Sequence, residues 1–156
     1  MREYKVLVIG IGNILRSDDG LGPTVIKQLK QESWSSDILL VDCGTCPLAH
    51  LEQLSISRYL IIIDAIKNEQ PAGTVHQFYL EEIKKNDTLN TTTHSYSMTQ
   101  VIALAREINN LPQEIIYYGI EPATLDWGTE FSHSVREAIP QLIRKVKKKI
   151  NIFSKK

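Results

Sequence analysis

The chain has 156 residues, of which 42% are hydrophobic and 23% are charged, proportions that are ordinary for a soluble globular protein. It carries 18 Lys and Arg residues and 18 Asp and Glu residues, for a formal net charge of zero, so the total charge does not indicate a nucleic acid or an anionic membrane as a partner. The length fits one domain over residues 1–156. No apolar run approaches membrane-spanning length, and residues 1–10 lack a signal-peptide cleavage pattern, so we expect a cytoplasmic protein.

The first predicted strand leads into a polar loop. Val6–Ile9 are aliphatic and predict a buried strand. The run Arg16–Gly20 is too acidic for a core, and apolar residues at helical spacing then predict a helix over residues 21–31. Asp18 and Asp19 therefore lie on a strand-to-helix loop, which is where open α/β sheets bind ligands.

The glycines of this stretch suggest a dinucleotide site, but their neighbours argue against it. Gly10 and Gly12 fit the first two positions of the G-x-G-x-x-G fingerprint, and Leu15 stands at the third. Asp18 and Asp19 would also face a pyrophosphate, where like charges repel. No Gly-Lys-Ser/Thr follows, which excludes a P-loop. The loop therefore favours a cation over a phosphate.

The middle of the chain alternates predicted strands with a short helical segment. We predict strands over residues 37–42, 58–64 and 73–80, and a short helix beginning at Pro47. The run at 58–64 is apolar up to Asp64, which indicates burial on both faces of a parallel sheet. The alternating pattern at 73–80 indicates a strand near an edge.

Two capped helices and a fifth strand are predicted in the last part of the chain. Residues 81–93 are polar and irregular, and residues 114–120 form the strand. The capping-box pairs are Ser97 with Gln100, for a helix through Ile108, and Ser134 with Glu137, for the last helix. Pro140 is expected to break or kink that helix. The order β-α-β-α-β-β-α-β-α predicts an α/β fold, a three-layer αβα sandwich with a mostly parallel five-stranded sheet.

Three polar residues, Asp19, Asp64 and His94, recur at loops that follow predicted strands. The carboxyl ends of the first and third strands lie on one edge of a parallel sheet, so Asp19 and Asp64 can converge there and His94 can reach them. Two carboxylates and an imidazole suit a divalent first-row metal with open positions. On pattern alone, a helix cap or solvated strand end is the favoured interpretation of Asp64, and a loop histidine without a role is favoured for His94. Asp18 is interpreted as an acid that fixes the loop.

Residues 10–22, GIGNILRSDDGLG, resemble the opening motif G-x-G-N-x-L-x-x-D-D/E-G-x-G of the hydrogenase maturation endopeptidases. IIIDAIK at 61–67 and GIEP at 119–122 are similar to later elements of that family, in the same order. The resemblance implies a twisted sheet with helices on both faces. It also implies that Asp19, Asp64 and His94 form the metal-binding set.

This resemblance carries an expected function. The family trims the C-terminal tail from the large-subunit precursor of nickel–iron hydrogenases, so we expect an endopeptidase that acts after nickel insertion, with that precursor as its partner. Asp19, Asp64 and His94 would coordinate nickel carried by the substrate, as ligands and catalytic residues, with no organic cofactor. The bound ion would polarise the scissile carbonyl or activate water. We expect a monomer that binds neither nucleic acid nor membrane.

Two features depart from the family pattern. Asp42-Cys43-Gly44-Thr45 stands where the family often has D-G-G-T, and Ser95-Tyr96 follows His94 where several relatives have Gln-Leu. We expect both departures to bear on which precursor is recognised. Cys43 and Cys46 also form a C-x-x-C between a strand and a helix, which is typical of thioredoxin-like redox motifs. As a metal site, Cys43 and Cys46 would supply only two of the four Cys or His ligands of a typical zinc site. Two unpaired thiols are the favoured interpretation.

Two alternatives from other functional classes stay open. A non-catalytic metal-checking chaperone with the same site would bind the precursor and leave its mass unchanged. A thiol–disulfide oxidoreductase using Cys43 and Cys46 would survive loss of Asp19. Conventional protease motifs are absent, since the sequence has neither G-x-S-x-G nor H-E-x-x-H.

Overall fold

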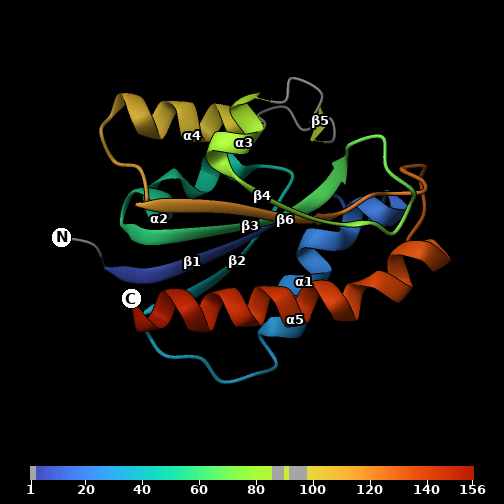
Figure 1. Ribbon diagram of the computed structural model, residues 1–156, viewed down its shortest axis with the longest axis horizontal. Coiled ribbons are helices and arrows are strands. Elements are labelled where there is room, and N and C mark those ends of the chain that lie inside the picture. Colours follow the sequence, from blue (N-terminus) through green and yellow to red (C-terminus); the bar gives the residue numbers. More distant parts are fainter. Residues whose placement is uncertain (1–2, 86–89, 92–97) are drawn as a thin grey trace.

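The computed structural model describes residues 3–85, 90–91 and 98–156. Its main sheet has the strand order β2-β1-β3-β6-β4, and β5 pairs with β3 off this path (Figure 1). The strands on the main path are β1 (Tyr4–Ile11), β2 (Ile38–Gly44), β3 (Ser57–Lys67), β4 (Val75–Tyr79) and β6 (Glu114–Ile120). β2, β1, β3 and β6 pair in parallel, and β4 pairs antiparallel with β6 at the edge. The predicted five-stranded, mostly parallel sheet is confirmed.

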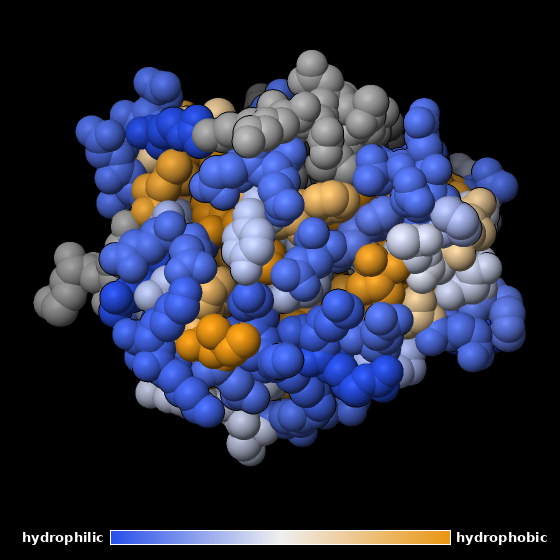
Figure 2. Space-filling view, in the orientation of Figure 1, coloured by the Kyte–Doolittle hydropathy of each residue, from blue (hydrophilic) through white to orange (hydrophobic). Residues whose placement is uncertain are grey.

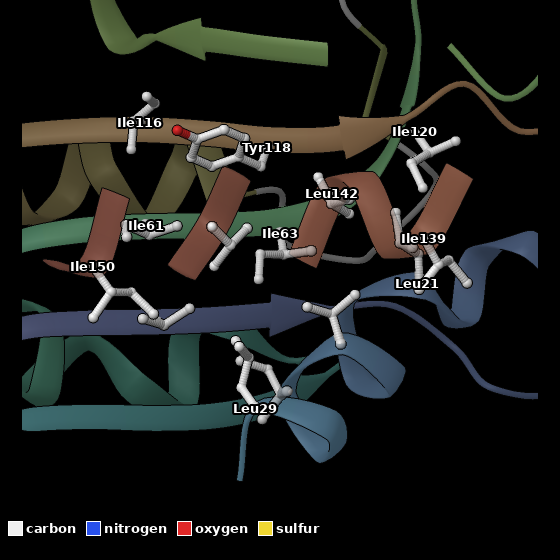
Figure 3. Packing of buried hydrophobic residues seen from close by; sticks show 14 of the residues in the cluster. Leu21, Leu29, Ile61, Ile63, Ile116, Tyr118, Ile120, Ile139, Leu142 and Ile150 are labelled. Atoms are coloured by element: carbon white, nitrogen blue, oxygen red, sulfur yellow. The ribbon is translucent and has the colours of Figure 1, made fainter. Parts of the chain in front are cut away.

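Helices cover both faces of the sheet, which gives the predicted three layers. Figure 1 shows α1 (Leu21–Leu29) and α5 (His133–Lys155) on one face and α4 (Met98–Glu107) on the other, on the side of α2 (Leu51–Ser55). Successive strand residues point to opposite faces, so Ile61 and Ile63 pack in the cluster under α1 and α5 (Figure 3). Leu60 and Ile62 belong to the cluster on the α2 and α4 side. The central strand is thus buried on both faces, as its apolar run predicts.

The prediction of an irregular segment over residues 81–93 is wrong in part. The structure has a short helix, α3 (Leu80–Lys85), and a two-residue strand, β5 (Asn90–Thr91). Thr91 and Asn90 pair antiparallel with Ile66 and Lys67 at the end of β3. Elements this short have too few turns or alternations to produce a hydrophobic period, so the sequence pattern does not reveal them.

The start of the last helix also differs from the prediction. Ser132, rather than Ser134, is the N-cap of α5, and its hydroxyl accepts a hydrogen bond from the Val135 N–H at 3.4 Å. The helix is not broken at Pro140, which lies on its exposed side. In Figure 1 the first turns of α5 are inclined to the remainder, which agrees with the predicted kink.

The surface is polar where α5 crosses it. The face shown in Figure 2 is mostly hydrophilic, with hydrophobic residues in separate small areas. Within residues 3–85, 90–91 and 98–156, no helix combines the length and the hydrophobicity that a bilayer crossing requires.

Candidate metal centre

Close backbone packing places the two acids of the first loop. They lie in a short 3-10 helix, η1 (Ser17–Gly20), between β1 and α1. Gly12 has φ +148°, and a Cβ built on it would lie 1.8 Å from the carbonyl oxygen of Asp19. A Cβ on Gly10 would lie 2.4 Å from the carbonyl oxygen of Gly22. The glycines therefore let η1 and α1 pack directly against the end of β1, a role unrelated to phosphate binding.

Asp19 is buried at the carboxyl end of the sheet. Asp19 is 2% exposed, and its Oδ2 accepts a hydrogen bond from the Asn13 N–H at 2.9 Å. The Asn13 side chain in turn accepts a hydrogen bond from the Leu15 N–H at 2.9 Å. The loop over residues 13–15 is thus held against Asp19 by the motif's own asparagine.

Asp64 is the least satisfied acid of the site. It is 2% exposed on β3, and no described residue donates a hydrogen bond to its Oδ1. Burial raises the pKa of Asp64 well above its ordinary value, and the negative charge of Asp19 raises it further, while the Ala65 backbone N–H lowers it. Two carboxylates therefore share one buried region. A proton or a cation between them would relieve both burial and repulsion.

Tyr117 is a neighbour of this pair that the sequence analysis missed. It lies on β6 and is paired in register with Ile62 of β3. Its hydroxyl is buried and, within the part of the chain that the structure covers, has no hydrogen-bond partner. Burial raises its pKa, and the negative charge of Asp64 adds to the rise. A neutral phenol O–H thus lies near Asp64, whose Oδ1 has no described donor. The sequence pattern EIIYYGI indicates only a buried strand, so it does not single out Tyr117.

His94, the third predicted ligand, lies outside the described residues. Thr91 before it pairs with Ile66, two positions after Asp64. Met98 after it begins α4. The structure therefore brings Asp19 and Asp64 together at one sheet edge and does not test His94. In the three described ranges, no group of three or more His, Cys, Asp or Glu residues is placed to hold a metal.

Asp18 fixes the loop, as expected. It is 1% exposed, and its carboxylate accepts four hydrogen bonds. The donors are the backbone N–H groups of Ala123, Thr124 and Ser132 and the hydroxyl of Ser132, at 2.7 to 3.1 Å. A carboxylate with this many donors is satisfied without a metal, so Asp18 holds the β6–α5 loop beside Asp19.

Comparison with known proteins decides the family. A family model described as hydrogenase maturation protease matches residues 23–149. The chain belongs to the hydrogenase maturation protease family. Among solved structures, it resembles the hydrogenase maturating endopeptidase HybD from E. coli, with a TM-score of 0.83 and 26% identity over 94% of this chain and 90% of that one. A hydrogenase 2 maturation peptidase from a Thaumarchaeota archaeon has a TM-score of 0.73 and 27% identity, covering 97% of this chain and 99% of that one.

Curated proteins with similar sequences are also hydrogenase formation or maturation proteins, in agreement with the family model. The hydrogenase expression/formation protein HupD of Thiocapsa roseopersicina is 29% identical over 144 residues, which are 90% of this chain and 63% of HupD. The hydrogenase 2 maturation protease of Escherichia coli is 26% identical over 144 residues, 91% of this chain and 88% of that protein. This chain therefore spans less than two thirds of HupD, and most of the E. coli protease.

Glu121, in the GIEP element, forms a second buried polar cluster. Its Oε2 lies 2.7 Å from His76 Nε2, and the two residues are 6% and 5% exposed. Both Glu121 oxygens accept from the Asn68 N–H, at 3.0 and 2.9 Å. The pair ties β6, β4 and the end of β3 together. Sequence reasoning missed it because the partners are 45 positions apart.

The C-x-x-C thiols do not have the properties of a redox pair. Both are free; Cys43 is buried and Cys46 is exposed. Burial, then the charge of Asp42, raises the pKa of Cys43 to about 12. A thiol–disulfide oxidoreductase needs an accessible cysteine with a lowered pKa, because the thiolate is the nucleophile. Cys43 is instead buried and has a raised pKa, which weakens the oxidoreductase alternative.

Proposed function

We propose that this protein is an endopeptidase that removes the C-terminal tail of a nickel–iron hydrogenase large-subunit precursor after nickel has been inserted. Membership of the maturation protease family supports the reaction class. The observation that carries the metal dependence is the buried Asp64, whose Oδ1 has no donor among the described residues and whose neighbour is a second carboxylate, Asp19. We propose further that it acts in the cytoplasm as a monomer.

In this proposal nickel is part of the substrate. Asp19 and Asp64 would bind the ion in the precursor, with His94 as the third ligand, because carboxylate and imidazole groups leave open positions on such a metal. A ligand must be deprotonated to bind. Asp64, whose pKa is raised by burial and by Asp19, would therefore lose its proton as the ion arrives. A precursor without nickel would leave the two acids sharing that proton and would dock weakly.

Cleavage itself is a hydrolysis. A water oxygen adds to the carbonyl carbon of the scissile bond, the carbon–nitrogen bond breaks, and the amine leaves with a proton. The ion would either polarise the carbonyl or activate the water. In this proposal Asp19 or Asp64 would accept a proton from that water and pass it to the departing amine.

The test is the intact mass of a nickel-loaded precursor after mixing with this protein, beside a nickel-free precursor. Loss of a C-terminal peptide only with nickel is the expected result. Asp19→Asn, Asp64→Asn and His94→Gln should abolish it, and Asp126→Asn, at an exposed acid in the β6–α5 loop, should not. Full processing by Asp19→Asn would refute the proposed site. Nickel-dependent co-purification with an unchanged mass would instead identify the chaperone alternative.

A further inference from the structure

A ridge of exposed apolar side chains lies beside the candidate site. Ile14 is 59% exposed, Leu15 is 52% exposed and Trp127 is 76% exposed. The two loops that carry them are joined, because the Gly128 N–H donates to the Leu15 carbonyl and the Ser17 N–H donates to the Gly128 carbonyl, both at 2.9 Å. Large apolar side chains gathered on a surface mark an interaction site more often than isolated ones do.

A groove adjoins this ridge. Ile14 and Leu15 form one wall, α1 contributes Pro23 and Lys27, and the α1 C-cap contributes Lys30. The whole cavity measures about 520 Å³. We call it the α1 groove. Its volume is in the range of sites that bind small ligands or a few peptide side chains.

The charge of the α1 groove is positive on the α1 side. Lys27, on α1, and Lys30, the residue that caps its C-terminal end, are three positions apart in helical geometry, so they project from the same side. Neither forms an ion pair with any residue whose side chain the structure describes. Asp42 is the acid in the lining, and its Oδ1 already accepts from the Gly44 N–H at 2.8 Å. An apolar wall opposite two lysines suits a peptide that carries an apolar side chain and a carboxylate.

The groove is also connected to the metal centre. Its wall begins at Ile14, and the preceding residue, Asn13, donates its backbone N–H to Asp19. One short loop therefore separates the proposed ligand Asp19 from the α1 groove. A peptide chain that leaves the site on this side would cross Ile14 and Leu15.

We propose that the α1 groove binds the C-terminal tail of the hydrogenase precursor, with an apolar tail residue against Ile14 and Leu15 and a tail carboxylate at Lys27 and Lys30. This proposal rests on the proposed function, since it names the part of that substrate which the groove holds. The carboxylate belongs either to an acidic side chain or to the tail's own C-terminus.

The test measures binding of a synthetic tail peptide to the full protein by fluorescence anisotropy at low and high salt. We expect Lys27→Glu with Lys30→Glu to weaken binding at least tenfold and Ile14→Ser with Leu15→Ser to weaken it similarly. The matched control is Lys145→Glu with Lys148→Glu, two exposed lysines at the same spacing on α5, which should stay within twofold. An amidated peptide and a peptide with its acids changed to amides distinguish the two carboxylate sources.

Cleavage of the nickel-loaded precursor separates this proposal from the proposed function. The groove variants should raise KM at least tenfold and leave kcat within twofold. If the bound carboxylate is an acidic side chain, a precursor whose tail acids are changed to lysine should restore a low KM with the charge-reversed protein. Unchanged peptide binding and unchanged KM in variants that cleave normally would refute the groove alone. A wild-type protein that binds the peptide through its lysines but never cleaves would refute the proposed function alone. A loss of self-association in the charge-reversed variant, without loss of peptide binding, would make the groove a contact between two copies and refute the proposal.

Discussion

Ser132 donates two hydrogen bonds to Asp18, one from its backbone N–H to Oδ1 at 2.7 Å and one from its hydroxyl to Oδ2 at 2.8 Å. The same hydroxyl caps α5 by accepting from the Val135 N–H. One serine therefore links the first loop of the chain to the start of the last helix. Asp19 is the next residue along that loop, so the geometry of the candidate metal centre depends on this link.

Asp18→Asn should destabilise the protein strongly. The amide is the same size as the carboxylate, but its NH₂ group would face backbone N–H donors and leave buried groups without partners. We expect the free energy of unfolding to fall by about 3 kcal/mol, measured by urea denaturation. Asp126→Asn, in the loop that Asp18 holds, is the control and should change the value by less than about 0.5 kcal/mol. Equal losses in the two variants would show that Asp18 does not hold the loop.

How much of this could be predicted from sequence depends on the range of the interaction. The runs Val6–Ile9 and Leu60–Ile63 predict buried strands because every residue in them is aliphatic. The partners of Asp18 lie 105 to 114 positions away, so no local pattern distinguishes Ser132 from Ser134 as the helix cap.

The candidate site shows the same limit. Spacing alone leaves Asp64 as a plausible strand end, and only the resemblance to a family predicts that it is a ligand. The structure adds that Asp64 is buried, has no described donor to Oδ1 and lies near the charge of Asp19. Neither the spacing nor the resemblance could supply these facts. Tyr117 could not be singled out because a tyrosine in an apolar strand has the pattern of any core residue.

Asp64→Asn should stabilise the metal-free protein near neutral pH. Burial and Asp19 raise the pKa of Asp64 well above 3.8, so above that pH the folded protein retains a proton that the unfolded chain releases. The free energy of unfolding of the wild type therefore falls as pH rises from about 3.8 to the raised folded-state pKa, by up to about 1.4 kcal/mol per pH unit. The asparagine variant lacks this fall.

The measurement is urea unfolding of both proteins between pH 4 and pH 8 in the presence of a chelator. The two should be similar near pH 4, and the variant should be more stable near pH 7. Asp126→Asn should follow the wild type at every pH. Parallel curves for wild type and Asp64→Asn would mean that Asp64 is ionised throughout and that its burial is relieved by some other charge.

The two cysteines should differ sharply in reactivity. Burial and Asp42 raise the pKa of Cys43 to about 12, so at pH 8 this thiol is almost entirely protonated, and it is also shielded from solvent. Cys46 is exposed. Iodoacetamide should therefore add one carbamidomethyl group to the folded protein, lost in Cys46→Ser, and a second only in urea. Processing activity should persist in Cys46→Ser, whereas an oxidoreductase would lose its activity. Rapid double labelling of the folded protein would contradict the burial of Cys43.

The buried pair of Glu121 and His76 should be worth more to stability than any exposed ion pair of this protein. Glu121→Ala would remove the common acceptor of the His76 ring and the Asn68 N–H, in a pair whose two residues, His76 and Glu121, are 5% and 6% exposed. We therefore expect a loss of about 3 kcal/mol in urea unfolding. The control is Glu114→Ala, which removes the exposed partner of Lys156 and should cost less than about 1 kcal/mol. Glu121→Gln keeps an acceptor for Asn68 and should recover part of the loss. Equal effects of Glu121→Ala and Glu114→Ala would show that the buried cluster contributes no more than a surface contact.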